Sequence, residues 1–345
     1  HDVVVVTRVR EHAAPIENAG LRLISLEMAR GGMRPWQELA TLLRLYRIYR
    51  YERPDLVHHV AVKPVLYGSL VAVFAGTRAV VNALTGLGFL FTSQRLLARL
   101  LRPPVELAMR MLLSRRNCRV IVQNTDDFNT LIAKGVVKAA NARLIRGSGV
   151  DTEAFVPAPQ ATGEPVVVLP ARLLWDKGVG EFVEAARRLK ARGIRARFAL
   201  VGDRDVENPA AVPQANIEAW RTEGVVELWG WRNDMAQVYR ESHIVCLPSY
   251  REGFPKVLLE AAACARPLVS TDVEGCREAV AHGRSGFLVP VRNAAALADA
   301  LAKLIEAPAL RDEFGANARA IVAGELSLAA VIERTLSVYR EILSA

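Results

Sequence analysis

The sequence predicts an α/β protein made of two doubly wound, Rossmann-like domains. Short β-branched runs alternate with helical patterns along all 345 residues, which is typical of parallel strands joined by helices. The length suits two domains of ordinary size. A Gly- and Pro-rich stretch over 147–165 interrupts the alternation. We therefore expect one domain over residues 1–150 and a second over residues 151–328.

The first half is expected to contain six strands, at Val3–Thr7, Leu21–Leu26, Asp55–Val60, Ala79–Ala83, Arg119–Gln123 and Arg143–Ile145. Helical patterns lie between them, at Trp36–Glu52, Pro64–Ala75, Ser93–Leu101 and Val105–Arg115. A Rossmann-like domain normally begins with a strand and a glycine-containing turn that binds phosphate. Because a strand-like run starts directly after Asp2, we expect that first strand–turn–helix unit to be missing.

The second half repeats the same rhythm of strands and helices. Its strand candidates are Val166–Leu169, Arg197–Val201, Val225–Trp229, Ile244–Leu247, Pro267–Ser270 and Phe287–Val289. Helical segments separate these runs, so the second half also predicts a parallel sheet covered by helices.

Composition excludes several classes of protein. Hydrophobic residues make up 51% and charged residues 23% of the chain, the balance of a folded protein with ample core material. The four cysteines form no CxxC pair and have no histidine at metal-ligand spacing, which indicates reduced thiols and no metal site. No segment reaches the roughly 20 apolar residues that a membrane-spanning helix needs, and we expect no secretory leader.

The net charge of +9 is distributed unevenly. Residues 1–150 hold 22 basic and 10 acidic residues, a net +12, whereas residues 151–345 hold 23 and 26, a net −3. A basic half can bind nucleic acid, anionic lipid or a phosphorylated ligand, so the motifs must decide among them.

The densest motif runs from Ser249 to Glu260. A strand ends before it, a glycine-containing turn follows, and Pro255 suits the start of a new helix. The free N–H groups at that helix start would suit a diphosphate. Glu252 on the turn and Glu260 in the helix could hold sugar hydroxyls. Taken alone, Glu252 is more simply a helix cap and Glu260 a solvated helix residue.

A second motif runs from Leu169 to Gly178. Arg172 follows a predicted strand and Lys177 opens the next helical segment, so both lie at the carboxyl edge where α/β sheets bind ligands. Two cations at this edge can neutralise a leaving diphosphate. Each is by itself an ordinary surface charge, but the combination with the paired glutamates is far more specific.

Together these segments resemble a family-4 retaining glycosyltransferase of the GT-B type, in which two Rossmann-like domains face each other across a cleft. The resemblance extends throughout the second half. It rests on Arg172…Lys177-Gly178, Val201-Gly202-Asp203, Leu228-Trp229-Gly230-Trp231, Glu252-Gly253-Phe254-Pro255, Glu260-Ala261, Gly275…Glu278-Ala279-Val280 and Gly286-Phe287-Leu288-Val289.

The resemblance implies a UDP-sugar in the interdomain cleft, no metal, and a final helix, 329–345, that crosses back onto the first domain. Arg172 and Lys177 would grip the diphosphate and Glu252 would contact the sugar, so these three are the candidate catalytic residues. The donor-binding candidates are Gly230, Trp231 and Arg232 near the base, Gly253, Phe254, Pro255, Lys256 and Val257 around the sugar and phosphate, and Glu260 at the ribose.

A narrower resemblance concerns the acceptor. The segments 171–179, 202–209 and 274–279 are similar to those of bacterial N-acetylgalactosaminyltransferases that extend undecaprenyl-diphosphate-linked bacillosamine. Other transferases of O-antigen and capsule assembly share parts of this signature. It implies a polyprenyl-diphosphate-linked acceptor without fixing the sugars.

Candidates on the acceptor side lie in the first half. The family often carries His-x-His before Lys-Pro; here His58 fits the first histidine, His59 is adjacent, and Lys63 precedes proline. Val60 stands where the second histidine is expected, so a packed or capping role for the histidines stays open. Gly86 and Gly88 resemble the acceptor-side loop, where glycine permits close backbone approach.

The basic excess of the first half includes an amphipathic helix. Arg95, Arg99 and Arg102 recur at i, i+4 and i+7, opposite a row of leucines, and a second segment carries Arg110. We expect Pro103 and Pro104 to end the first segment, giving a basic hairpin that lies on an anionic membrane surface. The alternative is a core-facing helix with a solvated basic face. Nucleic acid is not expected, because no binding motif is present.

The sequence thus predicts a retaining glycosyltransferase that moves a hexosyl or N-acetylhexosaminyl group from a UDP-sugar to an undecaprenyl-diphosphate-linked saccharide. It would work in the cytoplasm, on the inner face of the cytoplasmic membrane. Three alternatives use related parts: a UDP-sugar 2-epimerase, a dinucleotide oxidoreductase and a non-catalytic sugar-nucleotide sensor. The oxidoreductase is disfavoured because no G-x-G-x-x-G follows a strand.

Overall fold

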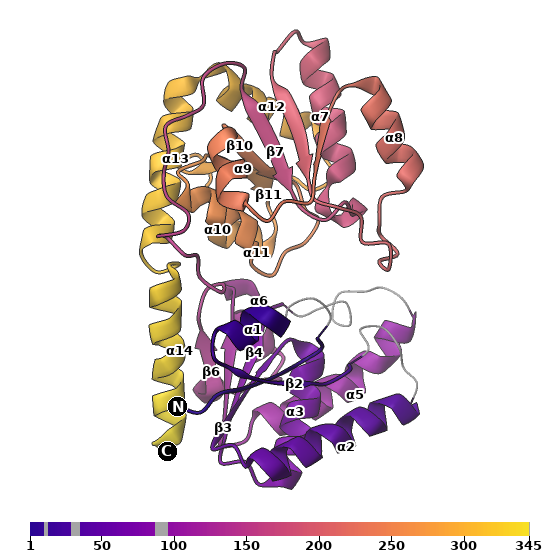
Figure 1. The fold of residues 1–345 in the computed structure, drawn as a ribbon, viewed down its shortest axis with the longest axis vertical. Helices are drawn as coiled ribbons and strands as arrows, with labels where there is room; N and C mark the ends of the chain where they lie inside the picture. The colour runs from indigo at the N-terminus through magenta and orange to yellow at the C-terminus, as the bar shows by residue number, and fades with distance from the viewer. Residues whose placement is uncertain (10–12, 29–34, 87–95, 345) are drawn as a thin grey trace.

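A computed structural model describes residues 1–9, 13–28, 35–86 and 96–344. Its strands form two larger sheets, one in each half of the chain, and Figure 1 shows them as two separate α/β units. The predicted two-domain, doubly wound α/β fold is therefore confirmed. Every predicted strand begins and ends within two residues of the observed one.

The second-half sheet is entirely parallel and has the order β12-β11-β10-β7-β8-β9. Its strands are β7 (Val166–Pro170), β8 (Arg197–Val201), β9 (Glu227–Gly230), β10 (Ile244–Leu247), β11 (Leu268–Thr271) and β12 (Gly286–Val289). Central strands such as β10 are buried on both faces, which explains why they read as continuous apolar runs rather than alternating ones.

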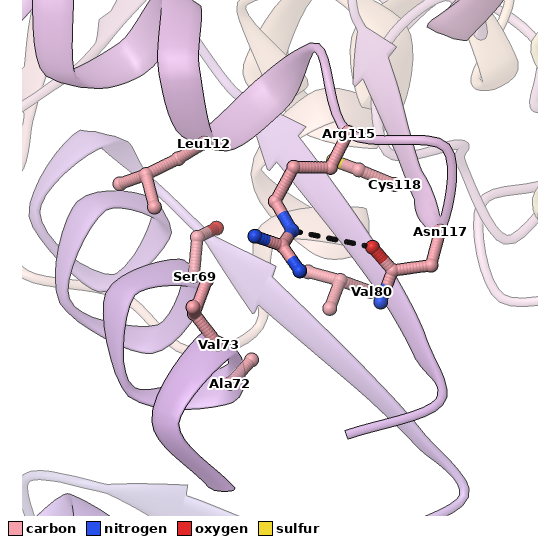
Figure 2. Close-up of a pocket in the computed structure, with 8 residues that line it drawn as sticks. All are labelled: Ser69, Ala72, Val73, Val80, Leu112, Arg115, Asn117 and Cys118. Atoms are coloured by element: carbon pink, nitrogen blue, oxygen red, sulfur yellow. Dashed lines mark hydrogen bonds between the residues drawn. The ribbon is translucent and has the colours of Figure 1, made fainter. Parts of the chain in front are cut away.

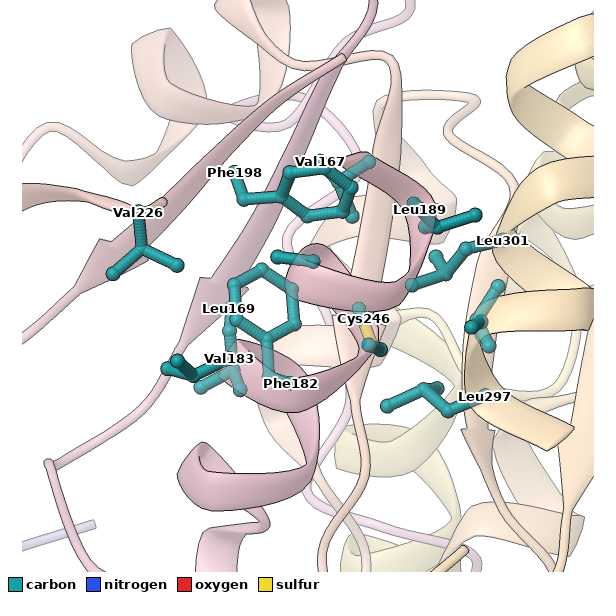
Figure 3. Packing of buried hydrophobic residues seen from close by; sticks show 14 of the residues in the cluster. Val167, Leu169, Phe182, Val183, Leu189, Phe198, Val226, Cys246, Leu297 and Leu301 are labelled. Atoms are coloured by element: carbon teal, nitrogen blue, oxygen red, sulfur yellow. The ribbon is translucent and has the colours of Figure 1, made fainter. Parts of the chain in front are cut away.

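Helices cover both faces of this sheet, and Figure 3 shows the core on one of them. There Phe182 packs edge-on against Phe198 with ring centroids 5.8 Å apart. The helices of this half are α7 (Val179–Ala191), α8 (Gln214–Glu223), α9 (Met235–Glu241), α10 (Lys256–Ala263), α11 (Glu274–Ala279), α12 (Ala294–Glu306) and α13 (Pro308–Ala323), with the 3₁₀ turn η2 (Trp175–Lys177). Burial of these apolar side chains is the main force that holds the domain together.

The first-half sheet has the order β3-β4-β5-β6 and is also parallel. Its strands are β3 (Leu56–Val60), β4 (Ala79–Leu84), β5 (Cys118–Val122) and β6 (Ala142–Leu144), and a separate parallel pair is made by β1 (Val4–Thr7) and β2 (Arg22–Ser25). The helices are α1 (Ala13–Asn18), α2 (Pro35–Glu52), α3 (Val62–Ala75), α5 (Leu96–Leu113) and α6 (Thr125–Ala133), with the 3₁₀ turn η1 (Ala139–Asn141). Helices α2, α3, α5 and α6 share one face of this sheet.

The opposite face of the first-half sheet is covered by the last helix of the chain, α14 (Leu328–Leu343), whose buried residues pack on β4 and β5. Figure 1 shows α14 lying beside the lower unit, directly below α13. The chain thus passes between the two halves twice, and the two passages touch. Val150 donates to Leu326 and accepts from Leu328 through its backbone, at 3.0 and 2.8 Å.

The expected hairpin at Pro103 and Pro104 is wrong. Both prolines lie inside α5, which continues from Leu96 to Leu113. Each proline lacks a backbone N–H donor, so the pair removes two donors and would normally break a helix. Here the second part of the helix buries Met109 and Leu113 completely in the domain core, and this packing sustains the helix beyond the prolines.

All four cysteines, at positions 118, 246, 264 and 276, are buried and unpaired, in agreement with the expectation of reduced thiols. Figure 2 shows the surroundings of Cys118, where a cavity of about 10 Å³ lies between α3, α5 and the sheet. Such a space holds about one water molecule. It is a packing defect of the first-half core and not a substrate site.

Candidate active site

The centre of the candidate site is an ion pair between two distant segments. The Lys177 ammonium lies 2.5 Å from Oε1 of Glu252, although the residues are 75 positions apart. The Ser249 hydroxyl donates to the same carboxylate oxygen at 2.7 Å. The side chains of Lys177 and Glu252 are 23% and 12% exposed, so both are largely buried. The two motifs therefore form one site, at the carboxyl ends of β7 and β10.

Backbone packing brings these two segments together. Gly178, which precedes α7, has φ = 72°, and a Cβ added there would lie 2.1 Å from the carbonyl oxygen of Pro248. Only glycine permits this approach and this φ. The Tyr250 amide also donates to the Asp176 carbonyl at 2.9 Å. Lys177 lies at the end of η2, one residue before the helix cap, rather than in the helix itself.

Arg172 carries the second cation of the site. Its Nη1 lies 2.5 Å from Oδ2 of Asp205, a residue that the sequence analysis did not select. Asp205 belongs to a loop that is fastened to the strand end, because the Leu173 amide donates to the Asp203 carbonyl at 2.9 Å. The Arg172 side chain is 54% exposed, so a ligand can reach it from solvent.

Helix α10 begins beside this ion pair. Pro255 is its cap residue, and Glu260, inside the helix, is 8% exposed. The Tyr239 hydroxyl donates to Glu260 at 3.0 Å, and the Lys256 ammonium lies 3.6 Å away. Burial raises the pKa of the Glu260 carboxyl, and the contacts with Tyr239 and Lys256 oppose that rise. Glu260 is thus a buried carboxylate that is fixed by Tyr239 and Lys256, and not a solvated helix residue.

The predicted base-side segment follows β9. Trp231 is 65% exposed, and Arg232 forms a two-bond pair with Asp234 at 2.6 Å. The Gly202 amide donates to the carbonyl of Gly230 at 2.8 Å, which ties this segment to the end of β8. Phe254 and Val257, by contrast, are partly buried against the domain core.

The turn between β10 and α10, residues 248–255, is the predicted donor loop and contacts the first domain through Gly253. A Cβ added at Gly253 would lie 2.1 Å from the Thr85 carbonyl oxygen and 3.5 Å from Cα of Gly86. Gly86, a predicted acceptor-side residue, therefore lies beside the donor loop. Gly88 lies outside the described residues.

The predicted histidines do not reach this interface. His59 is buried in the first-half core: Tyr49 Oη lies 2.6 Å from Nε2, and Asn82 Oδ1 lies 2.7 Å from Nδ1. Burial lowers the pKa of the His59 imidazole to about 4. His58 lies on the other side of the sheet, with Nδ1 2.6 Å from the Tyr339 hydroxyl of α14. The two adjacent side chains alternate across the strand, and both sides of the strand are covered.

Lys63 and Arg110, an expected membrane arginine, both contact other parts of the first domain. Lys63 pairs with Glu38 of α2 at 2.8 Å. Arg110 donates through Nη2 to the Lys134 carbonyl at 2.8 Å, and Arg102 lies half-buried on α5. Arg95 lies outside the described residues, as does the side chain of Arg99. None of the described helices is long and apolar enough to cross a membrane.

Sequence reasoning missed three residues of the site. Besides Asp205, these are Glu181, which accepts from the Tyr250 hydroxyl at 2.7 Å, and Asn124, which donates to the Gly253 carbonyl at 3.2 Å. Asn124 stands between a predicted strand and a helix, a position that marks a helix cap and also the ligand-binding edge of a parallel sheet. This position between strand and helix was the one signal in the sequence that could have identified Asn124 as a site residue.

The arrangement suits a ligand with a diphosphate. Two cations and the start of a helix lie at one sheet edge, where they can bind and stabilise negative charge. Each cation is neutralised by a carboxylate, so an incoming anion must replace carboxylate contacts. Among the described residues, no three His, Cys, Asp or Glu side chains are grouped so as to hold a metal ion.

Comparison with known proteins agrees with this geometry. Residues 164–307 match the family model "Glycosyl transferases group 1", and residues 1–124 match "Glycosyl transferase 4-like". The chain is 29% identical to an N,N'-diacetylbacillosaminyl-diphospho-undecaprenol alpha-1,3-N-acetylgalactosaminyltransferase of Campylobacter jejuni, over 92% of this chain and 85% of that protein. It is 25% identical to a UDP-Gal:alpha-D-GlcNAc-diphosphoundecaprenol alpha-1,3-galactosyltransferase of Escherichia coli, over 78% and 71%.

A solved structure shares the fold over nearly the whole chain. HepE of Anabaena, in complex with UDP and glucose, superposes with a TM-score of 0.78 at 19% identity, covering 98% of this chain and 91% of that one. The two family models together match most of the sequence, one in each domain. The chain therefore belongs to the group 1, family-4 glycosyltransferases and has their GT-B fold.

Proposed function

We propose that this glycosyltransferase moves a hexosyl or N-acetylhexosaminyl group from a UDP-sugar to a hydroxyl of an undecaprenyl-diphosphate-linked saccharide, with retention at the anomeric carbon. One observation carries the proposal: Lys177, Glu252 and the start of α10 lie together at one edge of the sheet, and Arg172 lies at the same edge. The names of the Campylobacter and Escherichia relatives support the acceptor class, and the UDP complex of HepE supports the donor.

The donor would lie with its diphosphate between Arg172 and Lys177. Glu252 would exchange its contact with Lys177 for a sugar hydroxyl, and Glu260, held by Tyr239, would accept from the ribose. The segment Gly230–Arg232 would border the base. A carboxylate that is already fixed by protein donors loses little conformational freedom when it binds a hydroxyl.

In the chemical step, the bond from the anomeric carbon to the β-phosphate oxygen breaks, and a bond to the acceptor oxygen forms on the same face. The acceptor proton passes to an oxygen of the leaving diphosphate. Negative charge grows on the diphosphate as the old bond breaks, so Arg172, Lys177 and the N–H groups at the α10 start stabilise the transition state more than the bound donor.

We propose that these cations replace a divalent metal. The test is turnover after exhaustive treatment with EDTA, with and without added Mg²⁺ or Mn²⁺. Equal rates in all three conditions are expected. A requirement for either cation would assign part of the charge stabilisation to a metal.

We also propose that the enzyme works at the inner face of the cytoplasmic membrane, as a peripheral protein, because its acceptor is a lipid. The basic first half supplies the charge, including Arg95, Arg99, Arg102 and Arg110 of the α5 region. Helix α2 adds an outward face of exposed residues: Trp36, Leu39, Leu43, Arg44, Arg47, Arg50 and Tyr51. Apolar and basic side chains on one helix face suit anionic headgroups.

Vesicle flotation tests the membrane proposal. Wild-type protein should float with vesicles that contain anionic phosphatidylglycerol and not with neutral phosphatidylcholine. Reversing Arg44, Arg47 and Arg50 to Glu should abolish flotation. The matched control reverses three exposed arginines of the second domain, Arg195, Arg221 and Arg284, and should float as wild type. Equal flotation of both triple variants would contradict the proposal.

The transferase proposal is tested with a panel of UDP-hexoses and UDP-N-acetylhexosamines, each incubated with membrane-extracted polyprenyl-diphosphate saccharides. UDP release and lipid mass are followed together. One donor should release UDP and add one sugar mass to the lipid. Epimerised donor without acceptor would favour a UDP-sugar 2-epimerase, and UDP-sugar binding without any product would favour a sensor.

A further inference from the structure

One residue of the first domain holds the donor loop of the second. Asn124 follows β5, is 1% exposed and caps α6. Its Oδ1 accepts from the Asp127 amide at 2.7 Å, and its Nδ2 donates to Asp127 Oδ2 at 2.9 Å and to the Gly253 carbonyl at 3.2 Å. A single side chain therefore joins the start of a first-domain helix to the loop that carries Glu252.

Two consecutive backbone carbonyls of the donor loop accept hydrogen bonds that anchor the loop. The carbonyl of Glu252 accepts from the Gly275 amide of its own domain at 3.2 Å, and the carbonyl of Gly253 accepts from Asn124. In a planar trans peptide the C=O and N–H groups point in opposite directions. The two anchors therefore fix where the amides of Gly253 and Phe254 point, one from within the domain and one from across the interface.

Other contacts hold the two domains together at this place. The Thr125 amide, at the start of α6, donates to Glu278 Oε1 at 2.8 Å, and Arg146 lies 3.0 Å from the same carboxylate. Arg277 donates to Asp126 at 2.8 Å. Gly253 itself has no room for a side chain against Thr85. The hydrogen bond from Asn124 to Gly253 therefore exists only while the domains are closed.

We propose that Asn124 is a positioning residue that orients the donor loop when the domains close, and thereby makes turnover depend on closure. The proposal rests on the donor site proposed above and goes beyond it by assigning a role in that site to a first-domain residue. Asn124 acts through the Gly253 peptide and does not touch the substrate. Binding of UDP to the open second domain does not need it, whereas the chemical step does.

The test separates this role from helix capping. Ser and Asp cap helices about as well as Asn, so both variants should keep the start of α6. Asn124→Ser should lower the unfolding midpoint only modestly, whereas Asn124→Asp, which places a second carboxylate against Asp127, should lower it more. Neither supplies the N–H group to Gly253. We expect kcat to fall about tenfold in Asn124→Ser and further in Asn124→Asp, whose carboxylate faces a carbonyl oxygen, while the Kd for UDP stays within about twofold of wild type.

Asn293 provides a matched control. It caps α12 in the same way, with its side chain accepting from the Ala296 amide at 2.9 Å, and belongs to the turn after β12 rather than to the donor loop. Asn293→Ser should leave kcat unchanged. Full kcat in Asn124→Ser, or equal losses in Asn124→Ser and Asn293→Ser, would overturn the positioning role.

Hydrogen exchange gives a readout that needs no turnover. In Asn124→Ser the amides of Gly253 and Phe254 should exchange at least about fivefold faster than in wild type, while the Asp127 amide, still capped, should not change. Unchanged exchange at Gly253 and Phe254 would overturn the inference. Absence of sugar transfer by wild-type enzyme with every donor and acceptor would instead overturn the proposed function, so the two failures are distinguishable.

Discussion

The two halves of the molecule place their predicted residues differently. In the second half, Lys177 and Glu252 meet at 2.5 Å and lie beside the start of α10, all at one sheet edge. In the first half, His58 and His59 lie under α14 and in the core, and Lys63 pairs with Glu38. The second-half residues stand on turns that directly follow strands, whereas the histidines stand within a strand. A strand end identifies the ligand edge; a position inside a strand does not.

The first prediction tests that difference directly and has the largest expected effect. Lys177→Ala should lower kcat about 10²–10³-fold with a smaller change in KM, because a cation aimed at developing charge is worth about 3–4 kcal/mol. Arg172→Ala should behave similarly. Lys63→Ala, the corresponding change in the first half, should lower kcat less than about threefold, since its pair with Glu38 is partly exposed.

Steady-state kinetics on the three variants provide the measurement, with UDP release as the signal. Equal losses for Lys63→Ala and Lys177→Ala would remove the contrast between the halves. Undiminished turnover in Arg172→Ala would defeat its role at the diphosphate.

The second prediction concerns the core position of His59. The pKa of its imidazole is about 4 in the folded protein, below the ordinary 6.5, chiefly because the ring is buried. The folded state thus favours the neutral ring, so this contribution to stability is complete above pH 6.5 and is lost as pH falls toward 4. The loss amounts to about 3 kcal/mol.

Urea unfolding between pH 7.5 and 4.5 measures this effect. His59→Gln should unfold with a shallower pH dependence than wild type over that interval. A retained slope would mean that other groups, and not His59, cause the acid sensitivity.

The third prediction concerns the contact between the halves. Gly253→Ala places a methyl group 2.1 Å from the Thr85 carbonyl, so the domains cannot close as they do here. We expect kcat to fall about 10–100-fold, which corresponds to about 1.4–2.7 kcal/mol, with an unchanged unfolding midpoint. Small-angle scattering should show a larger radius of gyration for the variant. Full activity with wild-type dimensions would show that closure around Gly253 is not needed.

The smallest expected effect concerns the carboxylate beside Arg172. Asp205 neutralises that guanidinium in the absence of ligand, so a diphosphate must displace it. Asp205→Asn should therefore tighten UDP binding about two- to fivefold, the scale of an exposed ion pair. Titration calorimetry gives the Kd. Asp299→Asn, which removes the partner of Arg192 at the C-terminal end of α7, is the control and should leave the Kd unchanged. Weaker binding in Asp205→Asn would make this residue part of the donor contact.

The sequence by itself determined the alternation of strands and helices, the two parallel sheets and the donor motifs. These features depend on short-range patterns: apolar runs for buried strands, and Gly or Pro at the turns that follow them. The joining of the 169–178 and 249–260 motifs also followed, because the carboxyl ends of parallel strands share one edge.

Only the tertiary structure decided the rest. Packing of Met109 and Leu113 carried α5 through two prolines, the pairing of β3 with its covering helices buried His59, and domain closure brought Asn124 to Gly253. In each case the residues that make the deciding contact are far apart in the sequence. Local propensity fixes which elements form, whereas long-range packing fixes which faces they present and what those faces meet.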